Sequence, residues 1–264
     1  MKSRFLALAA CFVGACGVGN RATASALIDN LNAGKSQTVV LYGTSETQFG
    51  RWADTVPGHS GLSDWLASKY GNRATVINSG MSGKGSNTGV ANLTTAVLNY
   101  HPDTVFIEFS MNDANTNYLT TDKDYNISLT QSRSNLNTMI DRIQAENPKT
   151  EIVLQTMNSV IDTGHYTNAT YRPNLNAYYD IYRDVAKQRG LLLVDNYVNW
   201  EALHASNTAL YESYLPDGLH PTAPGSLAIT LPAIEAALTP EPATLMAGTA
   251  LGLVALMRAP RRRR

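Results

Sequence analysis

Short apolar runs alternate with longer segments of helical period along most of this 264-residue chain, and this alternation limits the folds available to it. Five runs rich in β-branched residues cover positions 38–42, 74–78, 104–109, 151–155 and 191–194. Runs without strict polar alternation suit strands that are buried on both faces, as in a parallel sheet. The segments between them, of about 25 to 40 residues, leave room for one crossover helix each.

These segments predict five helices, over positions 60–69, 87–100, 129–146, 173–189 and 223–238. No repeat, low-complexity linker or break in composition divides residues 27–239, so we expect them to form one domain. We predict a flavodoxin-like, three-layer α/β/α domain with a five-stranded parallel sheet in the order 2-1-3-4-5. In such a domain, functional groups gather at the carboxyl ends of the strands, where the strand order reverses.

The first 26 residues have the order of a secretory signal peptide. Lys2 and Arg4 precede an apolar run over positions 5–18, and small residues then offer cleavage sites after Ala24 or Ala26. We therefore expect the domain to be exported.

The two cysteines of the chain, Cys11 and Cys16, both lie in this N-terminal segment. Under the signal-peptide interpretation the exported domain has no cysteine, which excludes disulfides, thiolate catalysis and cysteine-based zinc sites there. An alternative interpretation uses Val-Gly-Ala-Cys at 13–16, which resembles a bacterial lipobox and would leave a lipid on Cys16.

The C-terminal segment has three parts in order: Pro-Glu-Pro at 240–242, an uncharged stretch at 243–257, and Arg258 with four terminal arginines. This order resembles the PEP-CTERM sorting signal of Gram-negative bacteria, which implies an exosortase-type processing enzyme as a partner. The stretch is shorter than the ~20 residues of a comfortable membrane span, so we expect transient membrane association, with a plain C-terminal anchor as the alternative. Both interpretations place the domain in the periplasm, the outer envelope or the extracellular matrix.

Between these two ends the chain carries 13 Lys and Arg against 20 Asp and Glu, a net charge of about −7. An acidic body argues against nucleic-acid binding, which requires clustered cations. The glycines around Gly83 have the wrong spacing for a phosphate loop or a dinucleotide site, and the histidines show no metal-ligand spacing. We therefore expect neither a metal nor a cofactor.

Ser45 lies directly after the first predicted strand, in a Gly-Thr-Ser turn. A serine hydroxyl becomes a nucleophile only with a base within hydrogen-bond reach and with donors for the oxyanion that forms. Three other loops can supply these groups: a glycine-rich turn at 78–85 after the second strand, Asn112 after the third, and Asp217 with His220 near the C-terminus. The three-residue spacing of the last pair lets the carboxylate orient the imidazole.

This order of motifs resembles the SGNH hydrolase (GDSL esterase/lipase) family over nearly the whole predicted domain. The resemblance implies a catalytic triad of Ser45, Asp217 and His220, with Ser45 as the nucleophile. It also implies an oxyanion hole formed by the backbone N–H groups of Ser45 and Gly83 and by the side chain of Asn112.

Some residues depart from the family pattern. Thr44 stands where the family usually has aspartate, and Ser110 where it usually has glycine, but neither change removes a catalytic atom. Gly80 competes with Gly83 as the second oxyanion donor, although the family's Asn-x-x-x-Ser-Gly pattern favours Gly83. Glu46, directly after the nucleophile, is less expected: it either lies at the surface or disfavours anionic acyl groups.

Together the motifs predict a secreted serine esterase that hydrolyses carboxylic esters through an acyl-enzyme. Export and polar loops that contain aromatic residues favour O-acetyl groups of an extracellular polysaccharide as the substrate. One alternative is a lipid or long-chain acyl esterase or thioesterase with an apolar acyl groove. Another is a non-catalytic envelope protein that binds glycan. Each motif alone is also typical of a helix cap or a turn, but their agreement across four loops favours the enzyme.

Overall fold

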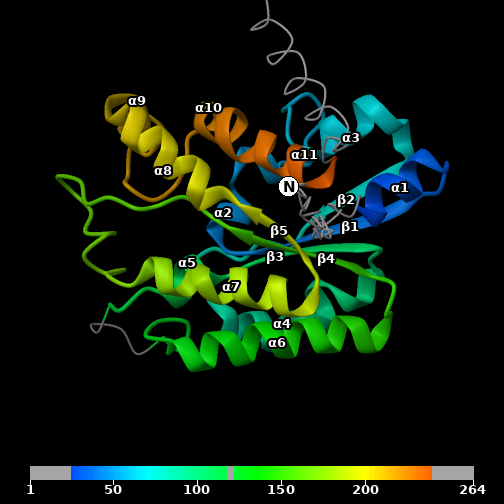
Figure 1. Ribbon diagram of the computed structural model, residues 1–264, viewed down its shortest axis with the longest axis horizontal. Helices are drawn as coiled ribbons and strands as arrows, with labels where there is room; N and C mark the ends of the chain where they lie inside the picture. The colour runs from blue at the N-terminus through cyan, green and yellow to red at the C-terminus, as the bar shows by residue number, and fades with distance from the viewer. Residues whose placement is uncertain (1–24, 118–121, 240–264) are drawn as a thin grey trace, which may run out of the picture. The chain divides into compact units, whose positions relative to one another are not determined.

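The computed structural model describes residues 25–117 and 122–239 (Figure 1). The predicted signal peptide up to residue 24 and the predicted sorting signal at 240–264 lie outside the described residues. Within the two described ranges, no helix has the length and apolar character needed to cross a membrane.

A parallel sheet of five strands forms the centre of the domain. The strands are β1 (Gln37–Gly43), β2 (Ala74–Asn78), β3 (Thr104–Glu108), β4 (Glu151–Thr156) and β5 (Leu192–Asp195). Their order is β2-β1-β3-β4-β5, with every neighbouring pair parallel. The predicted fold class and strand order are therefore confirmed, and each predicted run lies within two residues of its strand.

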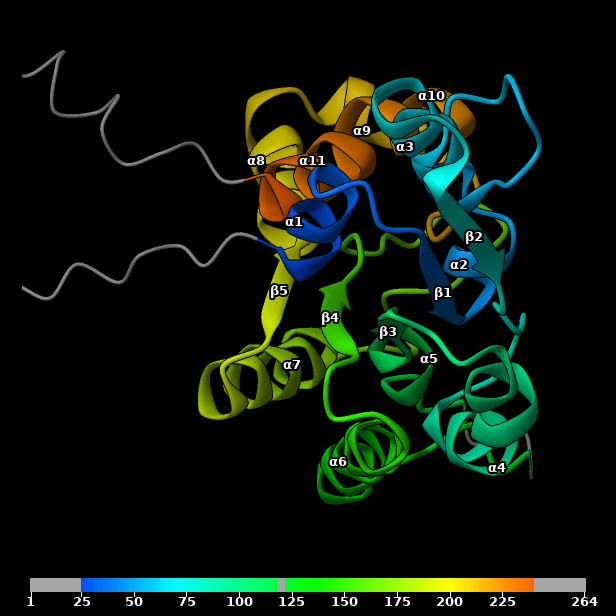
Figure 2. The same cartoon turned by 90° about the vertical axis from the view of Figure 1, so that its right-hand side faces the viewer.

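Helices cover both faces of the sheet (Figures 1 and 2). One face carries α4 (Ser86–Ala96), α6 (Leu129–Glu146) and α7 (Leu175–Arg189). The other carries α1 (Ala26–Asn32), α3 (Leu62–Tyr70), α8 (Asn196–Ser206) and α11 (Leu231–Leu238). Because both faces are covered, β1 and β3 are buried along almost their whole length.

The shorter helices lie at the ends of these elements. They are α2 (Ser45–Gln48), α5 (Ser110–Asp113), α9 (Thr208–Tyr214) and α10 (Ala223–Gly225). A turn of π-helix, Ser226–Thr230, joins α10 to α11, so the helix predicted over 223–238 is one helical segment in three parts. The sequence pattern did not predict α1, α2, α5, α8 or α9.

The longest helix, α6, shows why the prediction succeeded where it did. It begins after Ser128, whose hydroxyl accepts a hydrogen bond from the backbone N–H of Gln131 at 3.2 Å, and it ends before Asn147-Pro148, where the proline disfavours further helix. Its buried stripe packs toward the sheet and includes Leu136, Met139, Ile140 and Ile143.

The carboxyl ends of β1 and β3 lie side by side, because Gly43 pairs with Glu108. The chain leaves β1 into α2 and leaves β3 toward α5. Ser45 and Asn112 therefore come from neighbouring strand ends at the sheet edge where the strand order reverses.

Candidate active site

The turn after β1 sets the position of Ser45. Thr44 is the N-cap of α2, and its hydroxyl accepts a hydrogen bond from the backbone N–H of Glu46 at 3.2 Å. Gly43 is required before it, because a Cβ there would collide with Glu108 and Thr47. The turn is therefore tightly packed, and it holds Ser45 as the first residue of the helix.

Ser45, His220 and Asp217 form a continuous chain of hydrogen bonds, although Ser45 and His220 are 175 residues apart in the sequence. Ser45 Oγ lies 2.9 Å from His220 Nε2, and His220 Nδ1 lies 2.6 Å from Asp217 Oδ2. The His220 side chain is 42% exposed, so the pair can be reached from solvent. The structure thus brings together the three residues that the sequence predicted as a triad.

The Asp217 carboxylate is held by its own loop. Its Oδ1 accepts hydrogen bonds from the backbone N–H groups of Leu219 at 2.9 Å and His220 at 2.7 Å. Partial burial tends to raise the pKa of Asp217, but the hydrogen bonds from the His220 ring and from these N–H groups outweigh it and lower that pKa. An ionised Asp217 fixes the imidazole tautomer that has its free nitrogen facing Ser45.

Two of the predicted oxyanion donors, Gly83 and Asn112, lie close together at the turn that follows β2. The backbone N–H of Gly83 has no acceptor among the described residues, whereas the N–H of Gly80 donates to Asn78 Oδ1 at 3.0 Å. Asn112 donates one amide proton to the carbonyl of Lys84 at 3.0 Å, which keeps its second proton beside the same turn. Gly83 has a φ of +69°, a conformation that suits glycine. This geometry favours Gly83 over Gly80.

Asp113 holds the end of this turn through buried hydrogen bonds. It is fully buried and accepts hydrogen bonds from the backbone N–H of Ser86 at 2.7 Å and the hydroxyl of Ser132 at 2.6 Å. Burial raises the pKa of Asp113 to about 6. Ser86 is the first residue of α4, which follows the glycine-rich turn, so Asp113 fixes the position of the start of this helix.

Glu46 is buried, which excludes a surface position, the first of the two alternatives for this residue. Only 2% of it is exposed, and its Oε1 has no hydrogen-bond partner among the described residues. Burial, with further contributions from Glu108 and Asp217, raises the pKa of Glu46 well above its ordinary value. A carboxyl group in this setting favours its neutral form.

Glu108 supports the nucleophile turn and was not predicted as a site residue. Its Oε1 accepts hydrogen bonds from the backbone N–H of Thr44 at 2.7 Å, from the Thr44 hydroxyl at 2.9 Å and from the Thr47 hydroxyl at 2.7 Å. Burial raises the pKa of Glu108 to about 7. Thr44, which departs from the family pattern, is therefore bonded through both its backbone and its side chain.

Arg172 and Asn168 connect α5, which carries Asn112, to the loop that carries Asp217. The buried guanidinium of Arg172 donates from Nε to the carbonyl of Met111 at 2.9 Å and lies 3.4 Å from the carbonyl of Asn168. Asn168 in turn donates to the backbone carbonyl of Asp217 at 2.7 Å. The side chains of Arg172 and Asn168 together thus link the residue before Asn112 to the loop that carries Asp217.

Replacing Arg172 with methionine is expected to lower kcat by about 10- to 100-fold with little change in KM, because small displacements of catalytic groups have effects of this size. The measurement is steady-state hydrolysis of p-nitrophenyl acetate at a temperature where circular dichroism shows both proteins folded. Arg189→Met is the matched control, since among the described residues the Arg189 side chain bonds only to α6, through Asn137, Asp141 and Gln144. Equal losses in the two variants would contradict a positioning role.

No metal site is evident in the part of the chain that the structure describes. There, no three or more His, Cys, Asp or Glu side chains gather as metal ligands would. His59 pairs with Asp54 at 2.7 Å, and His204 stacks on Tyr211 with ring centroids 4.2 Å apart.

The chain is similar to known proteins in sequence and in fold. The GDSL-like Lipase/Acylhydrolase family model matches residues 41–228. The lipoprotein YqeF of Bacillus subtilis is 27% identical over 212 residues, which cover 72% of this chain and 85% of YqeF.

Two solved structures share the fold. Axe2, an acetylxylan esterase from Geobacillus stearothermophilus, has a TM-score of 0.62 at 18% identity, with 78% of this chain and 96% of Axe2 covered. LAE5, an α/β hydrolase enzyme from the metagenome of Lake Arreo, Spain, has a TM-score of 0.62 at 22% identity, with 77% and 95% covered.

Proposed function

The chain belongs to the GDSL-like lipase/acylhydrolase family and is a carboxylic ester hydrolase of that type, and we propose that Ser45, His220 and Asp217 are its catalytic triad. The observation that carries this proposal is the chain of hydrogen bonds from Ser45 Oγ to His220 Nε2 (2.9 Å) and from His220 Nδ1 to Asp217 Oδ2 (2.6 Å). This is the arrangement that turns a serine hydroxyl into a nucleophile.

In the proposed reaction, Ser45 Oγ attacks the ester carbonyl carbon while its proton passes to His220 Nε2. The N–H groups of Ser45 and Gly83 and the amide of Asn112 donate hydrogen bonds to the oxyanion. The bond to the alcohol then breaks, and the alcohol leaves with the proton from His220. Water attacks the acyl-enzyme with His220 again as the base, and the carboxylic acid leaves as Ser45 regains its proton.

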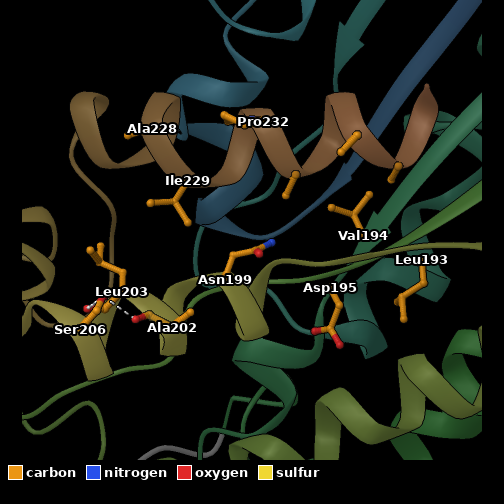
Figure 3. Close-up of a pocket in the computed structure, with 13 residues that line it drawn as sticks. Leu193, Val194, Asp195, Asn199, Ala202, Leu203, Ser206, Ala228, Ile229 and Pro232 are labelled. Atoms are coloured by element: carbon orange, nitrogen blue, oxygen red, sulfur yellow. Dashed lines mark hydrogen bonds between the residues drawn. The ribbon is translucent and has the colours of Figure 1, made fainter. Parts of the chain in front are cut away.

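We propose O-acetyl groups of an extracellular polysaccharide as the substrate. The fold is shared with the acetylxylan esterase Axe2, which supports this class. An apolar cavity of 590 Å³ does exist, between β5, α8 and α11, but none of the proposed catalytic residues lines it (Figure 3). That cavity therefore gives no support to a long acyl chain bound at Ser45.

The test is release of acetate from acetylated xylan and acetylated pectin by the purified protein, beside p-nitrophenyl esters of increasing acyl length. We expect release from a polysaccharide that Ser45→Ala abolishes, and p-nitrophenyl ester rates that fall as the acyl chain lengthens. Fast hydrolysis of long-chain esters with little acetate release would instead support a lipid or long-chain acyl esterase. Binding of glycan without hydrolysis of any ester would support a non-catalytic binding protein.

We also propose that the domain is exported. The relative YqeF is named as a lipoprotein, which supports export and is compatible with lipid attachment at Cys16. If a signal peptidase cuts instead, we propose the bond after Ala24, because Ser25 Oγ and the backbone N–H of Ala26 both donate to Glu151 at 2.7 Å and anchor α1. Residues 240–264 are proposed to act as the sorting signal for an exosortase-type enzyme.

A further inference from the structure

A polar hollow of 420 Å³ lies beside the nucleophile helix and has no part in the proposed reaction. It is lined by the end of α2 and the two residues that follow, by Asp54 and Thr55, and by the start of the turn after β2. Its volume is within the ~300–1,000 Å³ range of small-molecule sites.

The hollow lies on the β2 side of Ser45. The loop that precedes His220 packs on the segment after β4, through the bond from Ile161 N–H to the Gly218 carbonyl at 3.0 Å, and in the strand order β4 and β2 lie on opposite sides of β1.

Phe49 lies at this hollow and is strongly exposed. It is 71% exposed, the highest value among the exposed large hydrophobic side chains of the described residues. Its backbone N–H donates to the carbonyl of Ser45 at 2.9 Å, so it lies one helical turn from the nucleophile. Exposing an aromatic ring to water is unfavourable, but such a ring can pack on the C–H face of a sugar while neighbouring groups bond its hydroxyls.

The hollow has a fixed hydrogen-bonding group. Gln48 Oε1 accepts a hydrogen bond from the backbone N–H of Ser82 at 2.7 Å, which sets the orientation of the amide. Its Nε2 has no acceptor among the described residues and is free to donate to a ligand. A Cβ at Gly80 would collide with the backbone of Gln48, so the wall here is packed closely and is formed in advance.

The charge in the hollow is already paired. Asp54 Oδ2 lies 2.7 Å from His59 Nδ1 and 3.4 Å from an Arg51 guanidinium nitrogen, and Asp54 Oδ1 accepts from the N–H of Val56 at 2.8 Å. An ammonium ligand would therefore compete with Arg51 for this carboxylate. The carboxylate of a uronate would be repelled by Asp54 and by the net charge of about −7 on the body of the chain. A neutral polyhydroxyl ligand meets neither obstacle.

We propose that Phe49 and this hollow bind a neutral sugar residue of the substrate chain, next to the residue that carries the ester. The proposal rests on the proposed function and narrows its substrate class to neutral rather than acidic polysaccharide. The esterified sugar leaves on the His220 side, because His220 gives its oxygen a proton. The sugar in the hollow, across Ser45, is therefore another residue of the same chain.

The test compares Phe49→Ala with wild type on acetylated xylan and on p-nitrophenyl acetate. We expect KM for acetylated xylan to rise about five- to tenfold, the size of one aromatic contact, with both kinetic constants for p-nitrophenyl acetate within twofold. Phe49→Tyr should keep the wild-type KM. Tyr100→Ala is the matched control, because Tyr100 is also exposed (43%) but precedes β3, at the amino edge of the sheet.

A second measurement separates this proposal from the proposed function. Ser45→Ala protein, alone and combined with Phe49→Ala, is titrated with unacetylated xylo-oligosaccharide in a calorimeter, so that binding is read without chemistry. Binding that Phe49→Ala weakens supports the hollow even if no glycan ester is cleaved, a result that would overturn only the proposed substrate. An unchanged KM and unchanged binding in Phe49→Ala, or an equal rise of KM for p-nitrophenyl acetate, would overturn the sugar site.

Discussion

Ser45→Ala and His220→Ala are each expected to lower kcat by about 10⁴- to 10⁶-fold, and the double variant by no more than either alone. In the proposed reaction the two residues act as one unit, since Ser45 Oγ gives its proton to the His220 nitrogen 2.9 Å away and becomes a nucleophile only when His220 accepts that proton. Once one is lost, the second has nothing left to contribute. The measurement is kcat for p-nitrophenyl acetate at saturating substrate, with protein purified free of contaminating esterase.

The control for these variants is Ser213→Ala. Ser213 is an exposed serine on α9, and within the part of the chain that the structure describes its hydroxyl bonds only its own helix, at the carbonyl of Leu210, so its loss should leave kcat unchanged. Asp217→Asn is expected to lower kcat by up to about 10⁴-fold, because an amide favours the wrong imidazole tautomer. Losses that multiply in the double variant would contradict a shared proton transfer, and substantial activity in Ser45→Ala would exclude Ser45 as the nucleophile.

The sheet could be predicted because each strand is a contiguous apolar run with turn residues or a polar segment beside it. Helices with a long amphipathic stripe, such as α6, could be predicted because their signal also lies in a continuous stretch of sequence. The four-residue helices α2 and α5 were not, because a helical period cannot be recognised in a single turn. They matter most for the site, since Ser45 and Asn112 lie on them.

The proposed catalytic residues were predictable because each follows a strand or stands in a compact motif. Their supporting residues carry no such signal. Glu108 is the last residue of β3, and its contact with Thr44 spans 64 positions, which only the pairing of β1 with β3 brings together. Arg172 is one cation in a long loop, and nothing local shows that it reaches Met111. The burial of Glu46 likewise depends on tertiary packing.

Glu108→Leu is expected to destabilise the domain strongly and Glu108→Gln much less. Leucine leaves three donors of the nucleophile turn unpaired, namely the Thr44 N–H and the hydroxyls of Thr44 and Thr47, at a cost of about 1–3 kcal/mol for each donor that stays buried without a partner. Glutamine keeps an oxygen where Glu108 Oε1 accepts all three. The measurement is the free energy of unfolding in urea at pH 5, together with kcat for p-nitrophenyl acetate, which should fall in the leucine variant because the turn carries Ser45.

A second prediction for Glu108 concerns how the stability of the protein depends on pH. Folding raises the pKa of Glu108 from 4.5 to about 7, so between these values the folded protein holds a proton that the unfolded chain has lost. The free energy of unfolding therefore falls with rising pH across this window, by about 3 kcal/mol from this group, and Glu108 adds no further pH dependence above pH 7.

Glu108→Gln has no proton to lose, so from pH 4.5 to 8 its free energy of unfolding should rise relative to wild type by that amount. Glu46 and Asp113 also have raised pKa values, and both proteins contain them, so the difference between the two curves reports the loss of the Glu108 proton together with the effect of Glu108 on the pKa of Glu46. Parallel curves would show that the Glu108 carboxylate is ionised in the folded protein throughout, held by its three donors.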